Sequence, residues 1–188
     1  MKIGILGGTF NPIHIGHLIL AEEVREKLKL DKIIFVPAYL PPHKNNSEIA
    51  SVRDRYEMVK RAIKNNKNFS VSDIEIKRDG LSYTIDTINE FKRLYPKDEL
   101  YFIIGSDLLN YLDEWKDLGQ ILKMVKFIVA TRPGFSLEKI PSYISTIDIR
   151  AIDVSGYEIR RCIKEGRSFR YLVPETVYNY INKKNLYK

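Results

Sequence analysis

The chain has 188 residues, 44% of them apolar and 29% charged, with a formal net charge of +7. These values exclude a disordered or fibrous chain and predict a single globular domain over residues 1–188. The one cysteine, Cys162, excludes an internal disulfide and a four-thiolate metal site, and we expect it to pack on a helix. The positive charge favours anionic partners such as nucleotides, but no run of five like charges indicates a nucleic-acid-binding arm.

The chain lacks the sequence features of secreted and membrane-bound proteins. Only Lys2 precedes the first apolar run, which the glycine-rich turn then interrupts, so no signal peptide is indicated. No apolar stretch approaches the length of a membrane span. We expect a cytoplasmic protein with neither a membrane nor a nucleic acid as partner. The oligomeric state stays open, and a homo-oligomer is compatible with the sequence.

Strand and helix patterns alternate along the chain. Short apolar runs or strict alternation predict strands, and apolar positions at helical spacing predict helices. In chain order we predict strands at 3–6, 33–36, 69–76, 100–104, 127–130 and 147–154, and helices at 17–29, 52–64, 84–94, 156–165 and 174–183. The alternation predicts an α/β fold. Specifically, we expect a Rossmann-like, doubly wound parallel sheet with helices on both faces and a small C-terminal helical portion.

The turn between the first strand and the first helix is the most informative segment. It reads Gly7-Gly8-Thr9-Phe10-Asn11-Pro12-Ile13-His14-Ile15-Gly16-His17. Its glycines let the backbone approach a ligand closely, and N–H groups at a helix N-terminus attract an anion. His14 and His17 share a face of a first helical turn, where two imidazoles suit a phosphate group that gains charge during a reaction. The alternative is a glycine-rich turn with two surface histidines.

Polar candidates also follow the other predicted strands. They are His43 and Lys44 in a long polar loop at 38–51, Asp107 after Gly105-Ser106, Arg132 after the fifth strand, and Ser155 and Arg160 after the last. Open parallel sheets bind ligands at the carboxyl ends of their strands. We therefore expect these loops to converge on one site. A loop as long as 38–51 is typical of an active-site lid or of a disordered connection.

Several of these residues also have a purely structural interpretation. Ser106 or Asp107 could cap a following helix, and Asp107 could instead bind a ribose hydroxyl or a water on Mg²⁺. Ser155 is a candidate N-cap, and Ser82-Tyr83-Thr84 reads as a cap with a packing tyrosine. Tyr111 and Trp115 lie four residues apart, so on a helix they share a face, either in the core or around a flat heterocycle.

Taken together, these motifs resemble the nucleotidyltransferase superfamily, and nearly the whole chain is similar to bacterial nicotinate mononucleotide adenylyltransferases. The matching segments are 7–17, 41–44, 82–87, 105–107 with Trp115, 131–134, 155–160 and 170–174. The resemblance implies that ATP and nicotinate mononucleotide, with Mg²⁺, give nicotinate adenine dinucleotide and pyrophosphate in NAD biosynthesis. The competing readings are an adenylyltransferase for phosphopantetheine or a flavin, a class I aminoacyl-tRNA synthetase, and a non-catalytic nucleotide or RNA binder.

The resemblance also implies roles for individual residues. The catalytic group would be His14, His17 and Arg160. ATP would be held by Gly8, Thr9, Phe10, Gly105, Asp107, Ser155 and Ile159. Nicotinate mononucleotide and the phosphates would be held by Lys44, Tyr83, Thr84, Tyr111, Trp115 and Arg132. No side chain is expected to ligate a metal directly, with Asp107 acting through water at most. Gly156 and Tyr157 depart from the family pattern, which has hydroxyl residues at both positions.

The expected chemistry needs no protein nucleophile. The acceptor phosphate has a second pKa of about 6, so it is largely ionised at neutral pH. We expect it to attack the α-phosphorus of ATP in line, with the two histidines stabilising the charge that develops on the phosphoryl oxygens. Lys44, Arg160 and Mg²⁺ would neutralise the departing pyrophosphate.

Overall fold

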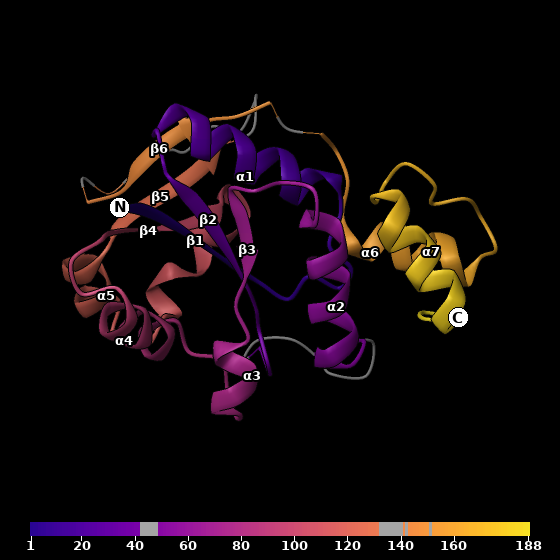
Figure 1. Cartoon of the computed structure of the whole chain (residues 1–188), viewed down its shortest axis with the longest axis horizontal. Coiled ribbons are helices and arrows are strands. Elements are labelled where there is room, and N and C mark those ends of the chain that lie inside the picture. Colours follow the sequence, from indigo (N-terminus) through magenta and orange to yellow (C-terminus); the bar gives the residue numbers. More distant parts are fainter. Residues whose placement is uncertain (42–48, 132–140, 142, 151) are drawn as a thin grey trace.

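Six strands form one parallel sheet in the computed structural model, which describes residues 1–41, 49–131, 141, 143–150 and 152–188 (Figure 1). The strands are β1 (Lys2–Gly8), β2 (Lys32–Pro37), β3 (Phe69–Val71), β4 (Glu99–Gly105), β5 (Lys126–Thr131) and β6 (Ser145–Asp148). Their order is β3-β2-β1-β4-β5-β6, and every neighbouring pair is parallel. The order reverses between β1 and β4, which is the point where doubly wound sheets bind their ligands. The predicted fold class is confirmed.

Helices cover both faces of this sheet. They are α1 (Ile15–Lys27), α2 (Val52–Ile63), α3 (Ile74–Arg78), α4 (Thr84–Leu94), α5 (Leu118–Met124), α6 (Gly156–Lys164) and α7 (Glu175–Lys184), with a 3₁₀ helix, η2 (Ser106–Glu114), after β4. Figure 1 shows α1 and α2 on one face and α4 and α5 on the other. The C-terminal helices α6 and α7 lie beside α2, and α7 packs against it. They form the small helical portion that the sequence predicts.

Successive side chains along a strand point to opposite faces of the sheet and pack into two separate hydrophobic cores. In β2, Ile33 and Phe35 join the core under α1 and α2, whereas Ile34 and Val36 join the core under α4 and α5. All four side chains are at most 3% exposed. Because both faces are covered, the strands read as continuous apolar runs and not as alternating ones. Cys162 is buried on α6, as predicted.

The structure corrects two predicted strands. The strand predicted at 69–76 ends at Val71, because Ser72 and Asp73 start α3: the Ile74 N–H donates to Ser72 Oγ, and the Lys77 N–H donates to the Asp73 carbonyl. The strand predicted at 147–154 is β6, at 145–148. Its pairing with the neighbouring strand runs from Ile128↔Ser145 to Thr131↔Asp148, and among the described residues no strand pairs beyond it.

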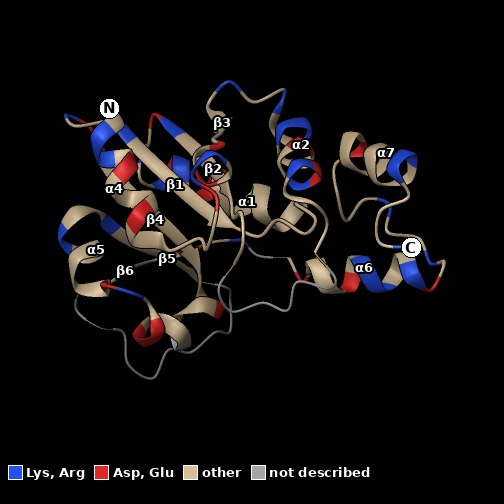
Figure 2. Ribbon diagram, turned by 90° about the horizontal axis from the view of Figure 1, so that it is seen from below, with Lys and Arg blue, Asp and Glu red and all other residues tan. Residues whose placement is uncertain are grey.

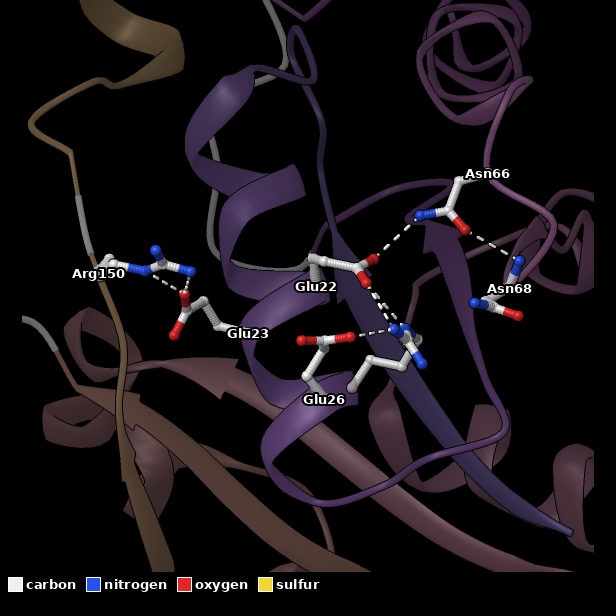
Figure 3. A network of polar contacts seen from close by, with 7 residues as sticks. Glu22, Glu23, Glu26, Asn66, Asn68 and Arg150 are labelled. Atoms are coloured by element: carbon white, nitrogen blue, oxygen red, sulfur yellow. Dashed lines mark hydrogen bonds and ion pairs between the residues drawn. The ribbon is translucent and has the colours of Figure 1, made fainter.

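Helix α1 is fastened on both sides by polar contacts (Figure 3). The Asn66 amide donates to Glu22 across a distance of 3.0 Å, which ties α1 to the turn before β3. The Arg150 guanidinium pairs with Glu23, which ties α1 to the segment after β6. These part-buried contacts on two sides restrict the helix orientation. Since the first turn of α1 carries His17, this orientation also sets the direction of that imidazole.

Charged residues are coloured mainly on the outer helices and at the strand ends in Figure 2, and the described strands carry charged residues only at their ends. Among the described residues, no helix is long and apolar enough to cross a membrane.

Candidate active site

The segment at residues 9–17, here called the histidine turn, carries two stacked imidazoles from β1 into α1. His14 has extended backbone and precedes the first residue of α1, and His17 completes the first turn. The two ring centroids lie 3.7 Å apart with planes inclined by 28°. The His14 backbone N–H donates to Nδ1 of His17 at 3.2 Å. In a neutral imidazole the proton is then on Nε2, so His17 presents Nε2 as a hydrogen-bond donor.

Close packing holds both imidazoles in place. His14 is 7% exposed, and the Phe10 ring lies edge-on to His17 with centroids 5.0 Å apart. A Cβ on Gly16 would lie 3.1 Å from Nδ1 of His14 and 3.0 Å from Val154, tighter than ordinary contact. A Cβ on Gly8 would lie 3.0 Å from the Phe10 ring. These two glycines therefore leave the space that the rings occupy.

The N-terminus of α6 packs directly against the histidine turn. Ser155 caps α6 as predicted, because its hydroxyl accepts the Glu158 N–H at 3.2 Å. The Arg160 guanidinium donates through Nη1 to the Asn11 carbonyl at 2.9 Å, and Ile159 behind it is fully buried. His14, His17 and Arg160 thus lie together at the N-termini of α1 and α6, although almost 150 positions separate them. The guanidinium and the two helix N-termini make this part of the site electropositive.

Gly105 and Asp107 lie at the end of β4, the neighbour of β1 across the point where the strand order reverses. The Asp107 carboxylate folds back over Gly105, since a Cβ there would lie 2.5 Å from Oδ1. Neither Ser106 nor Asp107 caps a helix, which corrects the structural alternative: Gly105 holds the cap position of η2 without a side-chain bond, and Ser106 is buried. The exposed Asp107 carboxylate remains available to a ligand.

The residues predicted to hold the acceptor ring lie around α4 and η2. Thr84 is the first residue of α4, after Tyr83. Ser82 does not cap this helix, because its hydroxyl accepts the Tyr39 N–H at 2.8 Å and so joins the segment after β2 to α4. Tyr111 and Trp115 do not share an α-helical face, since η2 is a 3₁₀ helix that ends before Trp115. Trp115 packs edge-on against Phe102 and Phe127 at 5.9 Å, whereas Tyr111 is 54% exposed.

Two predicted site residues, Lys44 and Arg132, lie outside the described residues, as does His43. Their predicted contacts with phosphate remain predictions.

The sequence analysis missed Arg55, which lies fully buried beneath the site. This α2 side chain is 1% exposed and donates to the carbonyls of Thr9, Tyr39 and Ala50 at 2.8, 3.0 and 3.0 Å. Burial lowers the pKa of its guanidinium. It joins the histidine turn to the segment after β2. The available signal was its spacing, because Arg55 lies three residues after Val52 and four before Val59, on the apolar face of the predicted helix.

Comparison with known proteins identifies the family of this chain. The family model described as cytidylyltransferase-like matches residues 5–152. The chain is 46% identical over 198 residues to a protein of Desulfitobacterium hafniense (strain Y51) described as a probable nicotinate-nucleotide adenylyltransferase; the match covers all of this chain and 96% of that protein. This chain belongs to the cytidylyltransferase-like family, among the nicotinate-nucleotide adenylyltransferases. A relative with the same description from Exiguobacterium sibiricum is 46% identical over 189 residues, covering all of this chain and 99% of the relative.

Solved structures share the fold of this family member. The nicotinic acid mononucleotide adenylyltransferase of Plasmodium falciparum complexed with NaAD superposes with a TM-score of 0.82 at 22% identity, covering 99% of this chain and 97% of that one. The same enzyme complexed with APC gives a TM-score of 0.80 at 22% identity, covering 99% and 96%. Similarity at this level of identity shows that the fold is common to both.

The two departures from the family pattern differ in their surroundings. A Cβ on Gly156 would lie 2.8 Å from the Asn11 carbonyl oxygen, so glycine lets α6 approach the histidine turn closely. Tyr157 is 62% exposed, and the Arg161 guanidinium lies 6.0 Å from its ring centroid. The Ser155 cap and the Arg160 contact are both present despite these two replacements.

Proposed function

We propose that this chain transfers the adenylyl group of ATP to nicotinate mononucleotide, giving nicotinate adenine dinucleotide and pyrophosphate, as an enzyme of NAD biosynthesis. The observation that carries the proposal is the convergence of His14, His17 and Arg160 at the N-terminus of α1, beside the point where the strand order reverses. Full-length similarity to nicotinate-nucleotide adenylyltransferases supports the choice of substrates.

The reaction transfers the adenylyl group by exchanging one bond at the α-phosphorus of ATP. A phosphate oxygen of nicotinate mononucleotide attacks the α-phosphorus of ATP. The bond from that phosphorus to the oxygen bridging the β-phosphorus breaks, and its electron pair leaves with pyrophosphate. The acceptor oxygen is already ionised near neutral pH, so no side chain has to remove a proton. Catalysis is then positioning of the two substrates together with electrostatic stabilisation of the transferring group.

The structure suits the histidines to that electrostatic role. The hydrogen bond to His17 Nδ1 fixes the orientation of the ring and places a proton on Nε2, which can donate to an oxygen on the α-phosphorus. His14 stacks on it at the N-terminus of α1, where the helix dipole favours negative charge. The Arg160 guanidinium, held on its other side by Asn11, suits the departing pyrophosphate.

Nicotinate mononucleotide would bind between the ends of β1 and β4, on the side of α4 and η2. Thr84 and Tyr83 at the start of α4, with Tyr111 and Trp115 around η2, would hold the nicotinate ring, and Lys44 and Arg132 the phosphates. Gly8, Thr9, Phe10, Gly105 and Asp107 would hold adenosine, with Ser155 and Ile159 beside the triphosphate. The hydrogen bond from the Tyr39 N–H to the Ser82 hydroxyl keeps the start of the segment after β2 beside the start of α4, which supports one continuous site for both substrates.

Mg²⁺ fits this site as an ion that binds with ATP. Among the described residues, no group of three or more His, Cys, Asp or Glu side chains could hold a metal ion. Mg²⁺ commonly binds through substrate phosphates, waters and one or two carboxylates, and the exposed Asp107 carboxylate can supply a contact through water. When bound, the ion would neutralise charge on the phosphates.

Product analysis tests the proposal. The protein is incubated with ATP, Mg²⁺ and nicotinate mononucleotide, and the products are identified by mass spectrometry. The proposal predicts equal amounts of nicotinate adenine dinucleotide and pyrophosphate. Release of ADP and phosphate, or no conversion at all, would contradict it.

A further inference from the structure

The histidine turn is held from outside by the C-terminal part of the chain. At its end, the Ile15 N–H donates to the Leu172 carbonyl at 3.0 Å. Near its start, Asn11 is 9% exposed and its side-chain oxygen accepts two hydrogen bonds, from the Ala50 N–H at 3.0 Å and from the Tyr187 hydroxyl at 2.8 Å. Both ends of the segment that carries His14 therefore rest on residues far away in sequence.

Tyr187 reaches Asn11 because the chain folds back after α7. The helix ends in a residue of left-handed conformation, Asn185, and the Leu186 N–H bonds back to the Ile181 carbonyl at 3.1 Å. Tyr187 itself has a φ of 67°, which is uncommon for a bulky residue and has to be maintained by its surroundings. Its ring packs partly buried against the core under α1 and α2. The hydroxyl is thereby directed at the Asn11 side chain.

We propose that Tyr187 is a positioning residue for adenylyl transfer: by donating to Asn11 it fixes the turn that places His14 and His17. The proposal rests on the function proposed above. Asn11 is also the residue whose carbonyl accepts from Arg160, so one amino acid receives contacts from α6 and from the segment after α7. Burial raises the pKa of the Tyr187 hydroxyl, which keeps it protonated and able to donate throughout the physiological range. The nearby Arg160 and Arg55 guanidinium groups partly offset that rise in pKa, and the hydrogen bond of Tyr187 to the histidine turn is made through Asn11.

The chain offers a matched control. Tyr180 on α7 is another partly buried tyrosine of the same core, and its hydroxyl donates to Asp54 of α2, also at 2.8 Å. Tyr187→Phe and Tyr180→Phe each remove one hydroxyl, keep the ring, and break one contact made by the C-terminal part of the chain. Only the first variant removes a contact with the histidine turn.

The test compares these variants in steady-state kinetics with ATP and nicotinate mononucleotide, at a temperature where both are folded by circular dichroism. Small displacements of catalytic groups act on the transition state, so Tyr187→Phe should lower kcat roughly tenfold with little change in either KM. Tyr180→Phe should keep kcat within about twofold of the wild type. Equal kcat values in the two variants, or a fall in kcat that only follows the loss of folded protein, would overturn the proposal.

A second measurement does not depend on turnover. The three histidines of the chain give few imidazole NMR signals, and His→Gln variants assign them. Tyr187→Phe should shift the ring signals of His14 and His17, whereas Tyr180→Phe should leave them unchanged. Unshifted signals in Tyr187→Phe would overturn the positioning role. If Tyr187→Phe shows these shifts but the wild-type protein makes no dinucleotide, the proposed function is overturned instead.

Discussion

Gly16→Ala separates stability from activity at this site. Gly16 lies in the first turn of α1, where alanine favours the helix by up to about 1 kcal/mol. The new Cβ, however, would lie 3.1 Å from His14 Nδ1 and 3.0 Å from Val154, against an ordinary contact of 3.4–4 Å. His14 has to give way by a few tenths of an ångström, and it is stacked on His17 at 3.7 Å. If a displacement of 1 Å costs about 100-fold, one of about 0.3 Å costs roughly fourfold in kcat.

The assay pairs urea unfolding with steady-state kinetics on the same preparation. Gly16→Ala should keep or slightly raise the free energy of unfolding while lowering kcat at least about fourfold. Gly119→Ala on α5 is the matched control, because a Cβ there meets nothing within 4 Å and Gly119 also lies in a first helical turn. It should raise stability and leave kcat unchanged. A Gly16→Ala enzyme with wild-type kcat would refute the argument that this glycine leaves the space for His14.

Three further predictions address other parts of the account. His17→Ala should lower kcat roughly 100- to 1,000-fold with an unchanged circular dichroism spectrum, and near-normal turnover would remove His17 from the catalytic group. Arg55→Met leaves three backbone carbonyls without their charged donor and should reduce the free energy of unfolding by about 3–5 kcal/mol in urea titrations, with Arg55→Lys intermediate; a wild-type midpoint in Arg55→Met would contradict this. Burial and Asp54 raise the pKa of Tyr180 to about 12, above the ordinary value near 10, so the unfolded chain loses this proton first and stability should fall between pH 10 and pH 12. Tyr180→Phe should make that fall shallower, and an identical slope would rule the group out.

The elements with a strong period were predictable from the sequence. Helix α4 was predicted with its observed bounds, because its apolar residues recur at helical spacing and pack under the sheet. The two failures at β3 and β6 have a common cause: both lie at the sheet edges, where the length of a strand is set by its one neighbour and not by its own side chains. Side-chain alternation through residues 72–76 could not reveal that Ser72 and Asp73 start α3 instead.

The site was predictable where it depends on local sequence. The spacing predicted that His14 and His17 lie together at the start of the helix, although His14 has extended backbone before α1, and the Ser155 cap was predicted from its position before the last helices. The contacts that hold the site together were not predictable, since they join Arg55 to Thr9 and Tyr187 to Asn11 across long stretches of chain. Such contacts depend on how α2 and α7 pack, which no local pattern encodes. The 3₁₀ geometry of η2, which separates Tyr111 from Trp115, likewise reflects tertiary packing overriding a helical pattern.

The most direct test of the central claim is the choice of acceptor. Pyrophosphate release from ATP and Mg²⁺ is measured in parallel with nicotinate mononucleotide, nicotinamide mononucleotide, phosphopantetheine and flavin mononucleotide. The account predicts that kcat/KM is highest for nicotinate mononucleotide by at least about tenfold. A preference for phosphopantetheine or the flavin would contradict the assignment of Thr84, Tyr111 and Trp115 to the nicotinate ring, and release with none of the four would contradict the proposed activity itself.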